Sequence, residues 1–368
     1  MQIPFIDLKT QYQNLKLKIH NQINKVLEHG QYIMGPEVAE LEDRLANYTG
    51  SKYCITVSSG TEALLISLMA LDIGIGDEVI TTPFTYASTA EVIALLGAKP
   101  VFVDIDKETF NINASLIESK ITKNTKAIIP VSLYGQTSDM DEIVNIAKNN
   151  NIIVIEDAAQ SFGATYKEKK SCNLSDIGCT SFFPSKPLGC YGDGGAIFTN
   201  DIKLADILKK IRIHGQSSKY IYERIGVGGR MDTIQCAIIL AKLDSFDEEI
   251  KKRQEAAKNY DSLFKKYSNL KNKIKIPVIK PYGTSAFAQY TVLVENRDQM
   301  IKKLSDQGIP SAVYYPLPLN QQNPYKKYCC PDCTNVSDDY SKKVISLPIS
   351  AFIKKDQQEF IVKTFMSD

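Results

Sequence analysis

Apolar side chains recur at helical spacing near the start of the chain and predict two helices. Between residues 11 and 29 they follow the pattern of an amphipathic helix, which is expected to end near Gly30. The stretch GPEVAELEDRLANYTG predicts a second helix, with Pro36 near its start and Gly50 past its end. The apolar positions of the first helix are Tyr12, Leu15, Ile19, Ile23, Val26 and Leu27.

Beyond these helices the pattern changes to short apolar runs that alternate with helical segments. Continuous runs such as AIIPV and IIVI are typical of strands buried on both faces of a sheet. Helices between the strands imply mostly parallel order, so the sequence predicts an α/β fold with a mostly parallel, seven-stranded sheet between helices. The expected strands are residues 53–57, 78–81, 100–103, 126–131, 152–155, 179–182 and 196–198.

The rest of the chain predicts a smaller second domain. Residues 200–265 are predicted to be helical, with a long helix from about Asp232 whose charged second half leads into this domain. A strand within AQYTVLVE, a helix near residues 297–308, the stretch AVYYPLPLN and a short terminal helix would follow. Because 368 residues exceed what one hydrophobic core usually covers, we expect a large domain over residues 1–249 and a small C-terminal α/β domain over residues 250–368.

Composition and charge restrict the possible partners. The formal charge is +2 and there is no long basic block, so neither nucleic acid nor an anionic membrane is expected as a partner. No apolar run reaches the length of a membrane span, and the stretch MQIPFIDLKTQYQ lacks the charged and hydrophobic parts of a signal peptide. The sequence therefore predicts a cytoplasmic protein.

Three of the eight cysteines lie together in the stretch CCPDC, at Cys329, Cys330 and Cys333. Their spacing is compatible with metal binding. A closed tetrahedral site needs four ligands, however, and all three histidines are distant in sequence. Several other cysteines lie in apolar segments, where a thiol behaves as a small hydrophobe. No metal site is expected.

The stretch TSFFPSKPLGCYGDGGA presents a lysine in a constrained loop. Pro184, Pro187 and Gly189 surround Lys186 and forbid a helix there. For an isolated lysine, a surface turn with the amine in water would be the simpler interpretation. Asp157, 29 positions upstream in IIVIEDAAQS, changes this. Pyridoxal phosphate needs a lysine for its Schiff base and a carboxylate facing its pyridine nitrogen, so the pair indicates a site for this cofactor.

A phosphate group would need donors, and the stretch VSSGTEALLISLMAL offers them where a strand ends and a helix begins. Gly60 allows close approach of a ligand, and Thr61 and Glu62 lie in the first helical turn, where free N–H groups favour an anion. A plain capping box formed by Ser59 and Glu62 explains the same residues without a ligand. Alone, this stretch is weak support for a phosphate site.

Other candidate residues also have a structural alternative. Asp157 is expected at the carboxyl end of a strand, where ligands bind in open α/β sheets, but Asp157 and Gln160 also fit the start of a helix. Gln160 would reach the phenolic oxygen of the ring. Ser181 could donate its hydroxyl to the phosphate or be an ordinary strand residue. Tyr86 could stack on the ring or belong to the core.

Taken together, these motifs resemble one family. Gly60–Thr61–Glu62, Tyr86, EDAAQS and SFFPSKPLG followed by YGDGGA are similar to the DegT/DnrJ/EryC1/StrS sugar-nucleotide aminotransferases, which are fold-type-I pyridoxal phosphate enzymes. The resemblance runs from FIDLKTQY and GQYIMGPEV through VSLYGQ to YYPLPLN. No single motif is specific, but the combination is.

The resemblance implies a role for each matching position. Lys186 resembles the lysine that forms the Schiff base, and Asp157 the partner of the pyridine nitrogen. Gln160 resembles the ligand of the phenolic oxygen, and Tyr86 the stacking aromatic. The residues that resemble the phosphate-binding shell are Gly60, Thr61, Glu62 and Ser181.

The family is dimeric, and the loop that resembles GVGGRMD reaches the neighbour's cofactor. Many members have asparagine where this chain has Gly228, so Arg230 is the candidate that replaces this contact with the cofactor. Phe162 stands where histidine is common, and Tyr314 where relatives often have histidine before YP.

The resemblance also implies a substrate class. The region around Lys186 is most similar to the branch that transfers the amino group of glutamate to C3 of UDP-2-acetamido-2-deoxy-3-oxo-glucuronate, in sugar biosynthesis for surface polysaccharides such as the lipopolysaccharide O-antigen. Members that act on dTDP-3-oxo-6-deoxy sugars usually have PGKNLGA in place of PSKPLGC. Another UDP- or dTDP-linked 3- or 4-ketosugar is the alternative.

Three other functions compete with this one. A related dehydratase uses the aminated cofactor, has histidine in place of Lys186, and in some cases contains an iron–sulfur cluster. A nucleotide-binding relative without activity would be expected to lack Lys186 or Asp157, and both are present. A pyridoxal lyase or aldolase of the same fold would not be converted to the amine form of the cofactor by glutamate.

Overall fold

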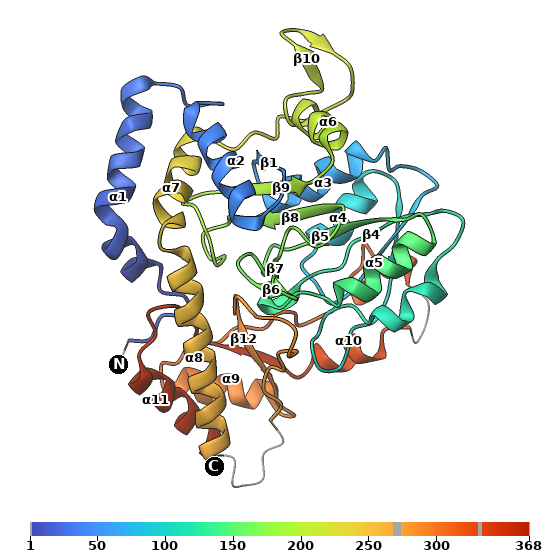
Figure 1. Cartoon of the computed structure of the whole chain (residues 1–368). Coiled ribbons are helices and arrows are strands. Elements are labelled where there is room, and N and C mark those ends of the chain that lie inside the picture. Colours follow the sequence, from blue (N-terminus) through green and yellow to red (C-terminus); the bar gives the residue numbers. More distant parts are fainter. Residues whose placement is uncertain (1, 268–273, 330–332, 368) are drawn as a thin grey trace.

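Two N-terminal helices flank the central sheet in the computed structural model, which describes residues 2–267, 274–329 and 333–367 (Figure 1). Helix α1 (Leu8–His29) begins where the Asp7 carboxylate accepts the Thr10 N–H at 3.0 Å and ends at Gly30, whose φ of 70° is left-handed. Helix α2 (Pro36–Thr49) starts on its proline and also ends at a left-handed glycine. Both predicted helices are confirmed.

The sheet has seven strands in the order β1-β9-β8-β5-β4-β2-β3. Neighbouring strands from β8 to β3 run parallel, and β9 lies antiparallel between β8 and β1. The predicted α/β fold with a mostly parallel sheet is therefore confirmed. The strands are β1 (Tyr53–Val57), β2 (Glu78–Thr81), β3 (Lys99–Phe102), β4 (Thr125–Ile128), β5 (Ile153–Asp157), β8 (Ile177–Ser181) and β9 (Gly195–Thr199).

Successive residues of each central strand enter different apolar cores. Cys54 and Phe198 pack with α1, α2 and α7 (Thr233–Leu243), whereas Ile55 and Ile197 pack with α3 (Gly60–Ala70) and α6 (Ile202–Arg212) on the opposite face. Helix α4 (Ser88–Leu95) joins the α3 side, and α5 (Met140–Asn149) covers the other face through Val154. Burial on both faces explains why the strands are continuous apolar runs.

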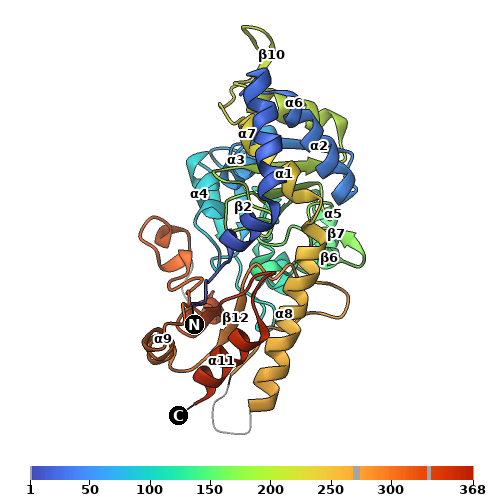
Figure 2. The same cartoon turned by 90° about the vertical axis from the view of Figure 1, so that its left-hand side faces the viewer.

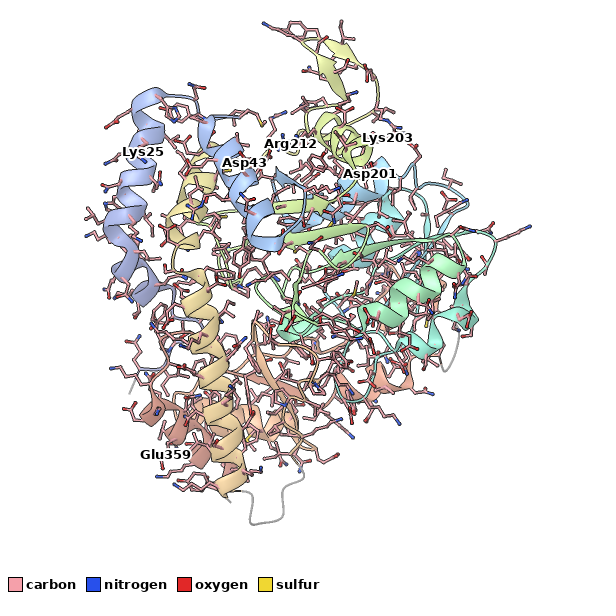
Figure 3. All side chains as sticks on the ribbon, in the orientation of Figure 1. Lys25, Asp43, Asp201, Lys203, Arg212 and Glu359 are labelled. Atoms are coloured by element: carbon pink, nitrogen blue, oxygen red, sulfur yellow. The ribbon has the colours of Figure 1, made fainter. Side chains whose placement is uncertain are left out.

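Residues 200–265 differ from the prediction of a helical region. Helix α6 begins after Asp201, whose carboxylate caps it by accepting the Lys203 and Leu204 N–H groups. The helix ends at Arg212 (Figure 3). The chain then forms an exposed hairpin of β10 (Gln216–Ser218) and β11 (Ile221–Tyr222), which projects beyond α6 (Figure 1). Gly215, three residues after α6, has a left-handed φ of 78°, which is incompatible with continuation of the helix. The prediction was wrong here because it gave too little weight to the glycines.

The long helix predicted from Asp232 is two helices. Helix α7 ends at Leu243, and α8 (Phe246–Tyr267) begins after Asp244 and Ser245. Helix α8 extends from the sheet to the C-terminal part of the chain, which lies at one end of the molecule (Figure 2). There Tyr260 and Phe264 of α8 enter the C-terminal core.

The C-terminal core is formed by a short sheet and helices. Strand β12 (Tyr290–Leu293) pairs antiparallel with β13 (Val344–Leu347), and α9 (Arg297–Asp306), α10 (Asn335–Tyr340) and α11 (Lys355–Met366) complete this part. Ile3 also packs into this core. The division of the chain at residue 249 stays a prediction. No helix within the described residues is long and apolar enough to cross a membrane.

Phe162 lies at the centre of an aromatic cluster that joins several elements near the predicted site. Its ring stacks on Tyr48 of α2 at 5.4 Å and on Phe246 of α8 at 5.6 Å. Phe182, just after β8, meets the Phe162 ring edge-on at 6.0 Å. Phe198 of β9 lies tilted against the same ring at 6.1 Å. Phe162 is therefore an apolar residue that packs the sheet against both helices.

We expect Phe162→Ala to destabilise the protein by about 3–5 kcal/mol, because it removes a buried ring and leaves a cavity between α2, α8 and the sheet. Urea unfolding followed by circular dichroism measures this change. The control is Leu17→Ala, whose side chain is 74% exposed and whose loss should change the free energy of unfolding by less than about 0.5 kcal/mol. Equal effects of the two substitutions would contradict the packing role of Phe162.

Candidate active site

The predicted site residues lie beyond the carboxyl ends of neighbouring strands. Asp157 is the last residue of β5 and Ser181 the last residue of β8, and these strands pair in parallel with Asp157 opposite Cys179. Lys186 follows in the loop after β8, and Gly60 begins α3 after β1. The carboxyl edge of a parallel sheet is the usual ligand site of such folds.

Asp157 is buried and held from several directions. Its Oδ2 accepts the Thr89 hydroxyl at 2.9 Å, and its Oδ1 accepts the Ala159 N–H at 3.2 Å. Its backbone is part of the sheet, because its N–H donates to Pro130 and its carbonyl accepts from Ser132. Burial raises the pKa of the carboxyl, and the Thr89 hydrogen bond and the charge of Lys186 oppose this. A buried carboxylate with so little compensation favours a cationic partner.

Lys186 lies close enough to Asp157 for the two charges to interact. Burial lowers the pKa of the Lys186 amine, and the Asp157 carboxylate raises it. The backbone N–H of Lys186 donates to Phe183 at 2.9 Å, which closes the loop that the prolines begin. A desolvated amine is neutral more often than one in water and is therefore a better nucleophile and base.

Gln160 has one end occupied and presents the other to the site. Its Oε1 accepts the Tyr134 N–H at 2.9 Å, so its Nε2 is the remaining donor. This Nε2 donates to the Tyr315 hydroxyl at 3.5 Å, a long contact. An amide N–H in this position suits an anionic oxygen such as the phenolate of the predicted cofactor.

Tyr315 comes from the C-terminal part of the chain and was not among the predicted site residues. Its ring meets Phe84 edge-on at 6.3 Å, and burial and the Asp157 carboxylate raise the pKa of its hydroxyl. Tyr86 also acts electrostatically on this hydroxyl. Tyr86 itself is 61% exposed, so it is not a core residue of the described chain. Tyr315 therefore lies near Asp157, and the exposed Tyr86 near Tyr315 forms an accessible edge of this region.

The start of α3 packs closely against Ser181. A Cβ added to Gly60 would lie 2.7 Å from the Ser181 Cβ, so only glycine fits there. The Ser59 hydroxyl accepts the Glu62 N–H at 3.0 Å, which is half of the capping box. The described residues offer no partner for the backbone N–H groups of Gly60 and Thr61. These groups and the Ser181 hydroxyl are thus available to an anion.

The side chain of Glu62 does not complete the capping box. Its Oε2 is buried with no hydrogen-bond partner among the described residues, and burial raises the pKa of the carboxyl. It lies near Gly229, where an added Cβ would be 3.5 Å away. Because its N–H is used by Ser59, Glu62 has less to offer a phosphate than its two neighbours.

Arg230 lies in the loop next to the start of α3. The Gly229 carbonyl accepts the Ser58 N–H at 2.9 Å, which ties this loop to the end of β1. A Cβ at Gly228 would lie 3.2 Å from His214 and 3.6 Å from the Arg230 guanidinium. A larger residue at position 228 would therefore displace His214, and Arg230 occupies the space beside the glycine.

The predicted cysteine cluster is only partly within the described residues. Cys329 and Cys333 have sulfur atoms 3.3 Å apart, and Cys330 lies outside the described residues. In the described ranges no group of three or more His, Cys, Asp or Glu side chains has the arrangement of a metal site.

These residues fit pyridoxal phosphate. A desolvated amine lies by a buried carboxylate, an amide donor points to the same space, and a glycine-bounded helix start offers N–H groups to a phosphate. The arrangement defines a fold-type-I pyridoxal phosphate transferase. The profile of the DegT/DnrJ/EryC1/StrS aminotransferase family matches residues 13–366, and the chain belongs to this family.

Individual relatives agree with this assignment. The chain is 54% identical over 353 residues to UDP-2-acetamido-2-deoxy-3-oxo-D-glucuronate aminotransferase of Pseudomonas aeruginosa, with 95% of this chain and 96% of the relative covered. A DegT DnrJ EryC1 StrS aminotransferase from Brucella abortus matches with a TM-score of 0.94 and 39% identity, covering 99% and 98% of the two chains.

A third similarity bears on the cofactor. NtdA from Bacillus subtilis, solved with bound cofactor PMP, matches with a TM-score of 0.90 and 30% identity over 99% of this chain and 85% of that chain. Solved structures that resemble this chain also include the PMP and the PLP forms of a putative sugar aminotransferase from Streptococcus pneumoniae. The protein is a pyridoxal phosphate-dependent aminotransferase.

We expect Tyr315→Phe to lower kcat about 10-fold, because Gln160 loses the hydroxyl that holds its donor end. Steady-state kinetics with glutamate measure this loss. The control is Tyr267→Phe, which removes a hydroxyl that donates to Glu359 between α8 and α11. That variant should keep full activity, and an unchanged kcat in Tyr315→Phe would remove Tyr315 from the site.

Proposed function

We propose that this enzyme transfers the amino group of glutamate to C3 of UDP-2-acetamido-2-deoxy-3-oxo-glucuronate. The observation that carries the transaminase chemistry is the desolvated Lys186 amine beside the buried Asp157 carboxylate. The substrate is supported by the 54% identity to the Pseudomonas aeruginosa aminotransferase and by the similarity around Lys186. The alternative is another UDP- or dTDP-linked 3- or 4-ketosugar.

In this proposal each site residue has a task in holding the cofactor. Asp157 pairs with the pyridine nitrogen, Gln160 donates to the phenolic oxygen, and Tyr86 covers the ring face. The phosphate is held by Ser181 and the N–H groups of Gly60 and Thr61, with Glu62 beside them. Arg230 takes the place of the contact that residue 228 makes in many relatives with the cofactor of the neighbouring subunit. When bound, the cofactor acts as an electron sink that stabilises negative charge on the reacting carbon.

Lys186 then performs the proton transfers. When an amino donor is bound, the Lys186 amine would accept a proton from the substrate carbon, and the burial that lowers its pKa favours the neutral amine that this transfer needs. The same Lys186 amine would then donate a proton to the reacting carbon of the cofactor. The Asp157 carboxylate would face the cationic ring nitrogen, and its position at the end of β5 fixes where positive charge is held. Water would release glutamate as 2-oxoglutarate while the cofactor retains the amino group, and the ketosugar would take up this amino group in the reverse sequence.

The sugar nucleotide would enter from the accessible edge beside Tyr86. Tyr314 and Tyr315 border this edge on the C-terminal side, where relatives often have a histidine in place of Tyr314. The carboxylate of a uronate favours an arginine or lysine partner. A product of this kind would serve surface polysaccharides such as the lipopolysaccharide O-antigen.

We also propose that the enzyme is a cytoplasmic homodimer with shared active sites. Support comes from the exposed apolar residues that gather on the hairpin and on the loop between α1 and α2. The loop between α1 and α2 is anchored to the start of α7, because Ile33 pairs with Asp232. The exposed apolar residues are Tyr32, Ile33, Met34, Tyr220, Ile221, Tyr222 and Ile225.

Two other activities are less well supported. A dehydratase that uses the aminated cofactor would have histidine in place of Lys186, and an iron–sulfur absorbance would be needed to revive it. A lyase or aldolase of the same fold would leave the cofactor in its aldehyde form when glutamate is added. Glutamate should instead abolish the visible aldehyde-form absorbance of this protein.

We expect Lys186→Ala to lower turnover by at least about 10³-fold, because the proton transfers lose their acid–base group. Pyridoxal phosphate should still bind, but without a covalent link that borohydride can trap, and mass spectrometry measures that link. Lys251→Ala is the matched control, because Lys251 is exposed on α8. Retained turnover in Lys186→Ala would contradict the role of this lysine.

A panel of UDP- and dTDP-linked 3- and 4-ketosugars tests the substrate directly. With glutamate present, we expect the UDP-linked 3-oxo-glucuronate to give an amino sugar at a rate at least about 10-fold above the others, since one added charge contact is worth that much. Mass spectrometry of the products measures the transfer. Faster amination of a dTDP-ketosugar would replace the substrate while leaving the transaminase chemistry intact.

A further inference from the structure

Lys242, near the end of α7, is a buried cation outside the proposed machinery. Its residue is 1% exposed, and its ammonium donates to the Gly189 carbonyl at 2.6 Å. The Tyr191 ring lies 4.2 Å from the same nitrogen, in a cation–π contact. Burial lowers the pKa of Lys242 to about 8, and Glu249 and Cys190 oppose this shift. A lysine is rarely buried without a strong contact that compensates for lost water.

The contacts of Lys242 fall on the loop that carries Lys186. The backbone N–H of Cys190 donates to Phe182 at 2.8 Å, and that of Lys186 donates to Phe183 at 2.9 Å. A Cβ at Gly189 would lie 2.5 Å from the Pro184 carbonyl, so the two arms of the loop are in close contact. A force on the Gly189 carbonyl therefore acts on the backbone just before Lys186.

Helix α7 holds this loop at a second point on the same face. Gln235 accepts the Tyr191 N–H at 2.9 Å through its Oε1. Gln235 and Lys242 are seven positions apart, which is close to two helical turns, so both side chains point in the same direction. The segment Gly189–Tyr191 is thus attached to a rigid element by two polar side chains. Within the described residues, the Lys242 ammonium has no hydrogen-bond or ring partner outside this segment.

We propose that Lys242 is a positioning residue that fixes the loop of Lys186 and so sets where the Lys186 amine stands relative to Asp157. The proposal rests on the proposed role of Lys186 in the reaction. It assigns Lys242 no contact with the cofactor or the substrate.

The test compares Lys242→Met, which keeps the length of the side chain but cannot donate, with Lys251→Met, which changes an exposed lysine of α8 in the same way. The readout is hydrogen exchange of the holoenzyme, followed by mass spectrometry of peptides that cover residues 183–192. Loss of a charged donor should speed exchange of the Lys186 and Cys190 amides by roughly 10- to 100-fold. Exchange in α11, far from the loop, should stay unchanged.

Kinetics and a conservative variant separate positioning from a general loss of stability. We expect kcat of Lys242→Met to fall roughly 10-fold or more, with KM for glutamate within about threefold, since the loop aligns the reacting amine. Lys242→Arg keeps a charged donor and should restore slow exchange and most of kcat. A folded Lys242→Met enzyme with the loop exchange and kcat of Lys251→Met would overturn the proposal.

If Lys242→Met does not fold, hydrogen exchange of the unaltered enzyme still tests whether the loop is fixed. The Lys186 and Cys190 amides should then exchange at least about 100-fold more slowly than unstructured chain, and rapid exchange would overturn the proposal. A separate measurement, retained turnover in Lys186→Ala, would show that the proposed function is wrong. Loop exchange in the Lys242 variants does not depend on that result.

Discussion

Removal of water from the Lys186 amine, opposite a carboxylate that is itself buried, is the constraint on which this structure depends. An amine in water would be protonated at neutral pH and could act neither as nucleophile nor as base. Burial shifts the pKa of Lys186 downward, and burial shifts that of Asp157 upward. Each charge partly offsets the cost of burying the other. A bound cationic ring next to Asp157 fits this balance.

The sheet provides the rigidity that this balance requires. Asp157 is both the end of β5 and a member of its hydrogen-bond ladder, since it donates to Pro130 and its carbonyl accepts from Ser132. One residue earlier, Glu156 is buried on the other side and accepts hydrogen bonds from Ser171 and Cys172 at 2.7 and 2.8 Å. Burial raises the pKa of Glu156 to about 7, which shows that burying this carboxylate also costs free energy. The strand end is thereby fixed from both faces.

The sequence allowed the sheet and the central pair to be predicted because both leave local signals. Strands buried on two faces are continuous apolar runs, and a lysine between prolines and glycine is unusual. Helix boundaries around residues 213–232 were missed, because the glycines and the short hairpin lie between strongly helical stretches. The two halves of the helix expected from Asp232 separate at Asp244–Ser245, where local propensity gives little warning.

Contacts between distant segments could not be predicted. Thr89 reaches Asp157 from α4, Tyr134 orients Gln160, and Tyr315 arrives from the C-terminal part. Each is an ordinary core or loop residue in sequence, and only the tertiary fold brings it to the site. Lys242 is the same kind of case, since a lysine in an apolar helix gives no sign that it bonds a loop 53 positions away.

The attachment of Asp157 to the sheet ladder has an evolutionary consequence. Asp157 is fixed at the end of a strand and Lys186 in the closed loop after the neighbouring strand, whereas Tyr86 and the segment around Tyr314 border the accessible edge. These borders can diverge, lengthen or be exchanged between homologues without moving the atoms that react. Selectivity for one sugar over another is therefore a separable trait in this scaffold, and grafting of border segments is the natural route to redirect it.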